Sequence, residues 1–291
     1  MKHAYCIIAH SEPRILKALI ELIDDVRNDI YLLVDAKTDI SIYSNIKPLF
    51  SQLIYVQRID IRWGDISQVK AELILFEAAY NNGPYKYYHL LSGVDLPLKS
   101  QNYIHHFMDE NAGKEFVGFA QGKMAEQDIF WKTRYYHFFL PYRRSKKLLF
   151  RLLNMISKFC ILFQKVLHFE RTYSMELKKG ANWVSITHDF CGYLLSKRVE
   201  ILKTFKYVLC ADEIFLQSIL WNSDFRTRIY AFEDEFDSCM RDIDWERGAP
   251  YTWRESDFSY LKSSNKLFAR KFSFKDMQIV ASLYFFIKKS V

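Results

Sequence analysis

Short apolar segments alternate with amphipathic segments over the first hundred residues, and this alternation restricts the fold more than any other feature of the chain. Apolar runs predict strands over 4–9, 29–34, 53–56 and 86–91. Between them, apolar side chains at helical spacing predict helices over 13–23 and 67–79, the second with Ser67 as its N-cap. Strands that alternate with helices form a mostly parallel sheet with helices on both faces. We therefore expect an α/β, Rossmann-like fold.

The rest of the chain mixes both kinds of element. A strand is predicted over 115–119 and another over 182–186. Helical spacing predicts the helices 103–108, 189–205 and 212–220. The apolar tail, 274–289, has lysines at its end and is either a closing helix or an element that contacts a membrane.

Composition restricts the class of protein. Half of the residues are apolar and 17% are aromatic, which is ample for a core. The net charge of +7 fits an anionic ligand or surface without choosing between them. The five cysteines are widely spaced without a CxxC pair, so we expect core thiols in a reducing compartment rather than a zinc or redox site. No signal peptide and no apolar run of spanning length is seen, which predicts a cytoplasmic protein.

Residues 142–171 form a basic amphipathic segment. Its apolar residues are interleaved with the cations Arg143, Arg144, Lys146, Lys147, Arg151, Lys158, Lys165 and Arg171. Two interpretations remain open: a surface helix packed on the core, or a helix whose face lies on an anionic membrane.

One acid follows the predicted strand 86–91, in the turn Leu91-Ser92-Gly93-Val94-Asp95-Leu96-Pro97. Open α/β sheets bind ligands at the carboxyl ends of their strands, although a lone turn acid is often merely solvated. Three further patterns occur in order along the chain. They are a strand that ends in Asp35, the segment Trp63-Gly64-Asp65-Ile66-Ser67, and Leu267-Phe268-Ala269-Arg270-Lys271-Phe272, the last preceded by Gly248-Ala249-Pro250-Tyr251-Thr252-Trp253-Arg254.

In this order, the four patterns resemble glycosyltransferase family 14, the core-2/I-branching β-1,6-N-acetylglucosaminyltransferases and peptide O-xylosyltransferases. The resemblance runs from about Ala4 to Lys271. It implies a GT-A type fold and an inverting, metal-independent sugar transfer from a UDP-sugar, without a cofactor. The matching turn offers the single acid Asp95 rather than an Asp-x-Asp metal motif. We interpret Asp242-Ile243-Asp244, late in the chain, as a non-metal segment.

The resemblance also assigns roles to residues on the donor side. A UDP leaving group gains negative charge as the C1–O bond breaks, and cations must offset it where no metal does. The family cations match Arg254 and Lys271. Arg270 is expected on the opposite face, because side chains alternate along a strand. Asp35 matches the acid near the uracil, Asp95 is expected near the ribose or the donor sugar, and His10 near the nucleotide.

On the acceptor side, Glu213 matches the family base that takes the proton of the acceptor hydroxyl. Asp212, beside it, is expected to cap the following helix. Trp183 and Trp245 match segments that contact the acceptor sugar.

The resemblance predicts one glycosyltransferase domain over 1–291, with a nucleotide-sugar half, 1–120, and an acceptor and catalytic half, 121–291. The family donors are N-acetylglucosamine and xylose, and the acceptor is expected to be a glycan or lipid-linked oligosaccharide at the inner face of a membrane. The alternative is a non-catalytic sugar-binding subunit of a polysaccharide-assembly complex. The cations concentrate in one amphipathic stretch and no nucleic-acid motif appears, so we expect no nucleic-acid partner.

Overall fold

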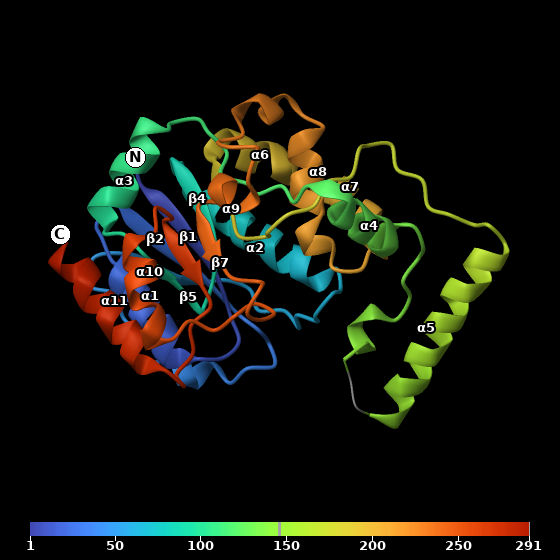
Figure 1. Ribbon diagram of the computed structural model, residues 1–291, viewed down its shortest axis with the longest axis horizontal. Helices are drawn as coiled ribbons and strands as arrows, with labels where there is room; N and C mark the ends of the chain where they lie inside the picture. The colour runs from blue at the N-terminus through green and yellow to red at the C-terminus, as the bar shows by residue number, and fades with distance from the viewer. Residues whose placement is uncertain (145–146, 291) are drawn as a thin grey trace.

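The computed structural model describes residues 1–144 and 147–290, so Lys146 of the basic segment lies outside the described residues. Its main sheet has five strands in the order β3-β2-β1-β4-β6 (Figure 1). The strands β1 to β4 are parallel and β6 is antiparallel to β4. Their bounds are β1 His3–Ala9, β2 Asn28–Val34, β3 Gln52–Tyr55, β4 Tyr87–Ser92 and β6 Ser185–Thr187. A second sheet joins β5 (Asp95–Pro97), β8 (Phe268–Arg270) and β7 (Arg241–Ile243).

Two apolar clusters cover the two faces of the main sheet. Along β1, Tyr5 and Ile7 enter one cluster while Ala4 and Cys6 enter the other, as the two-residue period of a strand requires. The first cluster contains helices α1 (Pro13–Ile23), α3 (Gln101–Glu110) and α11 (Met277–Lys289). The second contains α2 (Ser67–Asn82), α6 (His188–Ser196), α7 (Arg198–Phe205) and α8 (Phe215–Trp221). The predicted α/β class, with a mostly parallel sheet and helices on both faces, is confirmed.

Several predicted elements differ in the structure. The expected strand 115–119 is reduced to two isolated bridges, Glu115 to Ile229 and Phe116 to Ser185, because each residue pairs with a different segment. The expected helix 189–205 is divided into α6 and α7 at Lys197. Ser67 is the first residue of α2 rather than its cap, and its hydroxyl accepts a hydrogen bond from the backbone amide of Arg62.

The tail is a closing helix. The side chains of α11 that are buried in the first cluster are Ile279, Val280, Leu283 and Ile287. The other helices are α4 (Gly122–Thr133), α5 (Leu148–Val166), α9 (Glu235–Cys239) and α10 (Phe258–Ser263). None of the helices in the described part of the chain combines the length and the hydropathy needed to cross a bilayer.

A buried carboxyl joins the bridge segment to α6. Glu115 is fully buried and accepts hydrogen bonds from the amide N–H and the hydroxyl of Thr187, at 2.9 and 2.5 Å. Burial raises the pKa of Glu115 to about 7, against the opposing effect of these hydrogen bonds. In the unfolded chain, the same carboxyl ionises near its ordinary pKa of 4.5.

Glu115 should therefore make the protein less stable as the pH rises. Between the unfolded and folded pKa values the unfolded chain has already released the proton, so the free energy of unfolding falls as the pH rises through this window. Glu115→Gln removes this pH dependence. The difference in the free energy of unfolding between wild type and variant should therefore change by on the order of 3 kcal/mol across the window. Urea unfolding of both proteins at several pH values measures it, and parallel profiles would contradict the assignment.

Candidate active site

A cavity of about 790 Å³ opens where the parallel strands end. His10 to Glu12 enter it from the loop after β1, and Val94 from the turn after β4. The opposite wall comes from the second half of the chain: Thr252 to Arg254, Arg270 to Ser273, Lys275 and Asp276. The N-cap residues of α1 and α11, Glu12 and Asp276, line this space, so two helix N-termini, which favour anions, face it. The cavity lies where open α/β sheets bind ligands.

The charges that line the cavity are unbalanced toward the positive. Within the described ranges 1–144 and 147–290, no carboxylate lies within 4.0 Å of the charged groups of Arg254, Lys271 or Lys275. The two acids in the wall are engaged elsewhere. Glu12 accepts hydrogen bonds from the Ser273 hydroxyl and the Phe274 amide, and Asp276 caps α11 through the amide of Ile279. The arrangement therefore favours an anionic ligand.

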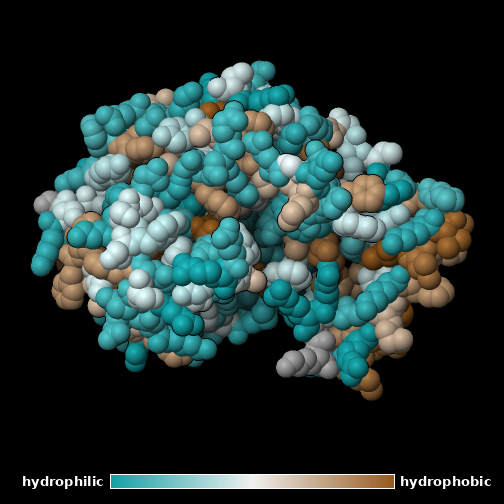
Figure 2. Space-filling model, viewed as in Figure 1, coloured by the Kyte–Doolittle hydropathy of each residue, from teal (hydrophilic) through white to brown (hydrophobic). Residues whose placement is uncertain are grey.

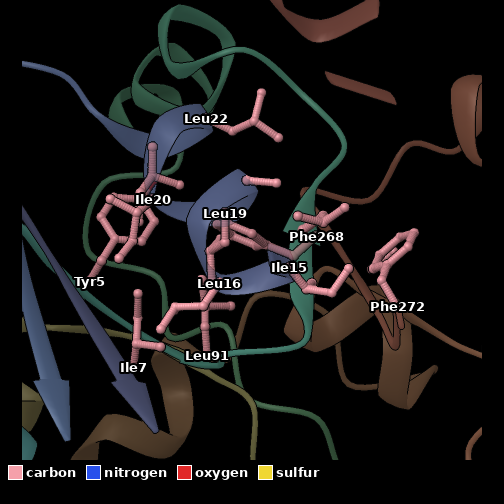
Figure 3. Close-up of a cluster of buried hydrophobic side chains, with 14 of the residues drawn as sticks. Tyr5, Ile7, Ile15, Leu16, Leu19, Ile20, Leu22, Leu91, Phe268 and Phe272 are labelled. Carbon is pink, nitrogen blue, oxygen red and sulfur yellow. The ribbon is translucent and has the colours of Figure 1, made fainter. Parts of the chain in front are cut away.

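Two buried phenylalanines fix the position of the cations between them. Phe268 and Phe272 lie in the apolar cluster with Ile15 and Leu16 of α1 (Figure 3). Arg270 and Lys271 stand between these two anchors and both line the cavity. The expectation that Arg270 points to the opposite face was wrong, because β8 ends at Arg270 and strand alternation does not extend to Lys271. In the sequence, the one indication that Arg270 lines the cavity is its position next to Lys271.

Arg270 also joins the cavity to Asp95. The Asp95 carboxylate is 2% exposed and accepts hydrogen bonds from the amide and hydroxyl of Ser92 and from the Arg270 guanidinium, the last at 2.8 Å. Trp183 lies against the same guanidinium, 4.4 Å from ring centroid to the carbon of the charged group. Asp95 and Trp183 thus border the cavity through Arg270 and are not part of its wall.

His10 and Asp35 lie at the ends of neighbouring strands. Desolvation lowers the pKa of His10, and Arg270 and Lys37 act in the same direction against the opposing carboxylate of Asp35. His10 therefore offers a neutral imidazole to the cavity. Asp35 is buried, and its carboxylate is held by the Lys37 ammonium at 2.7 Å.

Glu213 belongs to a second cluster, outside the cavity wall. Its carboxylate contacts the ammonium groups of Lys132 and Lys179 at 2.6 and 3.7 Å. Burial acts to lower the pKa of Lys132, but the carboxylates of Glu213 and Asp128 outweigh it and raise that pKa above its ordinary value. Lys132 therefore stays charged beside Glu213. Neither lysine was singled out from the sequence, because α4 and residue 179 lie far from Glu213 along the chain.

Asp212 does not cap a helix. Residues 211–213 form a short 3-10 helix whose N-cap is Cys210, and α8 starts two residues later. The Asp212 carboxylate instead accepts a hydrogen bond from the side-chain amide of Gln68 at 2.7 Å. Burial, followed by the charge of Glu213, raises the pKa of Asp212 to about 7.

Trp245 and the neighbouring acids lie at the end of β7. Trp245 is exposed and is not in the cavity wall. Asp242 accepts hydrogen bonds from Tyr260 and Ser264, and Asp244 pairs with Arg247. In the part of the chain that the structure describes, no group of three or more His, Cys, Asp or Glu side chains is placed to hold a metal ion.

The Arg270–Asp95 pair gives a stability prediction. Arg270→Ala leaves the buried Asp95 carboxylate without its cation, so we expect the free energy of unfolding to fall by about 3 kcal/mol. Arg254→Ala is the matched control, since it removes an exposed cation of the same cavity, and it should change stability by less than about 0.5 kcal/mol. Urea unfolding at neutral pH measures both variants. If Arg270→Ala and Arg254→Ala lowered the free energy of unfolding equally, the Arg270–Asp95 pair would contribute nothing specific to stability.

Three comparisons place the chain among known proteins to different degrees. A search of curated proteins found no match. Among solved structures, one similar chain is TarS of S. aureus, at 15% identity and a TM-score of 0.28. The match covers 46% of this chain and 25% of TarS, a likeness too low to support an argument. The family model described as "Core-2/I-Branching enzyme" matches residues 3–266. The chain therefore belongs to the Core-2/I-branching enzyme family of glycosyltransferases.

Proposed function

We propose that this protein is an inverting, metal-independent glycosyltransferase that moves a sugar from a UDP-sugar to a hydroxyl of a glycan or lipid-linked acceptor. The observation that carries the proposal is the cavity at the carboxyl ends of the strands, which is lined by Arg254, Lys271 and Lys275 without a carboxylate partner among the described residues, and by Arg270, which pairs with Asp95. Its volume of about 790 Å³ is in the range of small-molecule sites. Family membership supports a nucleotide-sugar donor and a glycan acceptor.

The diphosphate would lie against Arg254, Arg270 and Lys271. Negative charge develops on the leaving UDP as the bond to C1 breaks, and fixed cations lower the barrier by offsetting it. An arginine can donate two parallel hydrogen bonds to phosphate oxygens, while a lysine acts as a point charge. The Asp95 carboxylate is engaged by Ser92 and Arg270, so the acid at the usual metal position has protein partners already. This engagement supports the metal-independent form of the reaction.

Glu213 would act as the base. In an inverting transfer, the acceptor hydroxyl oxygen attacks C1 from the face opposite to UDP, and the C1–O bond to UDP breaks. One carboxylate takes the proton that the hydroxyl loses. The Glu213 side chain is 33% exposed, which leaves room for a hydroxyl to approach it. Trp183 and Trp245 would contact the acceptor sugar. N-acetylglucosamine and xylose are the candidate donor sugars.

Glu213→Gln should lower transfer by roughly 100- to 10,000-fold, because it removes the base while keeping the shape of the side chain. UDP affinity should stay within about twofold, since Glu213 lies outside the cavity. Transfer is measured as UDP release from UDP-N-acetylglucosamine and UDP-xylose with a panel of glycan acceptors. Glu200→Gln, which neutralises an acid on the exposed face of α7, is the control.

If Glu213→Gln lost UDP affinity by the same factor as it lost transfer, Glu213 would not be the base. Wild-type protein that binds UDP but transfers no sugar to any acceptor would favour the non-catalytic binding subunit instead.

Arg254→Ala and Lys271→Ala should each weaken UDP binding by about tenfold or more, because a hydrogen bond to a charged group contributes about 1.5 to 3 kcal/mol. Lys262→Ala, an exposed lysine of the nearby α10, should leave the affinity unchanged. Titration calorimetry with UDP measures all three, and unchanged affinity in both cavity variants would place the nucleotide elsewhere.

A further inference from the structure

Helix α5 stands apart from the sheet and the helices that cover its two faces (Figure 1). Polar side chains attach it to the segment 136–143. Asn154, Ser157 and Gln164 donate hydrogen bonds to the backbone carbonyls of Tyr142, Phe138 and Tyr136, at 3.3, 2.8 and 3.1 Å. The face of α5 turned toward the protein thus carries polar side chains, together with partly buried apolar ones such as Phe150, whose ring stacks on Tyr142 with 4.4 Å between the ring centroids.

The opposite face of α5 is apolar and exposed. Its central stripe has side chains that are 52% to 81% exposed: Leu148, Leu152, Met155, Phe159, Leu162 and Val166. Figure 2 shows apolar residues gathered at this edge of the molecule. A continuous exposed apolar face of this kind marks an interaction surface. Among the described residues, no side chain of α5 belongs to either buried apolar cluster, so the structure does not support the interpretation of the basic segment as a surface helix packed on the core.

Cations run along one side of this apolar face. Arg151, Lys158 and Lys165 occur at seven-residue intervals and are exposed. The Lys165 ammonium also lies 5.1 Å from the ring centroid of Trp131, itself 56% exposed, which extends the surface toward α4. The sequence has no acid between residues 142 and 169. A second copy of this helix would bring like charges together, whereas an anionic surface complements them.

We propose that α5 is a membrane-contact helix that lies in the plane of an anionic lipid bilayer. Its apolar stripe would enter the boundary between headgroups and acyl chains, while Arg151, Lys158 and Lys165 meet the anionic headgroups. Lysine and arginine side chains suit this position because their stems follow apolar surface while their charges stay in water. The proposal concerns α5 alone and holds whether or not the cavity transfers sugar.

Co-sedimentation with lipid vesicles tests the proposal. The full chain should bind vesicles of phosphatidylcholine with phosphatidylglycerol at low salt, bind pure phosphatidylcholine much more weakly, and lose binding at high salt. The triple variant R151E/K158E/K165E should bind at least about a hundredfold more weakly, since each surface cation contributes about fivefold. The control K17E/K70E/K203E makes the same change in net charge at exposed lysines of α1, α2 and α7, and it should keep most of the binding.

A second triple variant tests the apolar stripe. L152S/F159S/L162S should also lose vesicle binding, while L49S/F50S/V199S, at exposed apolar positions elsewhere, should retain it. Thermal unfolding checks that each variant folds, and sedimentation velocity gives the oligomeric state.

Three outcomes would overturn the proposal. The first is wild-type protein that does not bind anionic vesicles at low salt. The second is equal loss of binding in the charge-matched control, which would make the effect one of net charge alone. The third is a wild-type dimer that L152S/F159S/L162S dissociates without any change in vesicle binding, because the stripe would then pair two copies of the chain.

Discussion

Burial of Phe268 and Phe272 against α1 holds the chain between them at the rim of the parallel sheet. Because both anchors are in the core, Arg270 and Lys271 must stand at the edge where β1 and β4 end. The loop that carries Arg254 joins them there: the Trp253 amide donates a hydrogen bond to the Lys271 carbonyl at 3.0 Å. Packing in the core thus places cations that a flexible loop would leave in solvent, and the proposed reaction depends on that placement.

The site is assembled from both halves of the chain. His10 and the α1 N-cap Glu12 come from the first fifty residues, while the cations come from the last forty. Glu213 stands in a separate cluster with Lys132 and Lys179. Trp183 and the Glu213 cluster are linked by the Gly180 amide, which donates to the Glu213 carbonyl at 2.9 Å. The segment 180–183 thus contacts Glu213 through Gly180 and the cavity residue Arg270 through Trp183.

The first hundred residues were predictable because their signals are local. The helix Pro13–Ile23 was predicted with the bounds that the structure has, since apolar spacing within one helix determines which face is buried. The orientation of Arg270 and the conformation of the segment 115–119 were not predictable, because both depend on contacts with residues far away in the chain. For α5 the sequence predicted an amphipathic helix. Only its hydrogen bonds to residues 136–143 show which face is turned inward.

The central claim is that protein cations, rather than a metal ion, hold the diphosphate of a UDP-sugar in the cavity beside β8. Titration calorimetry of UDP against the full chain, with and without an excess of EDTA, tests it most directly. The account predicts binding of one UDP per chain with an affinity that EDTA does not change. Binding that disappears with EDTA and returns with a divalent ion would contradict it, as would the absence of any UDP binding.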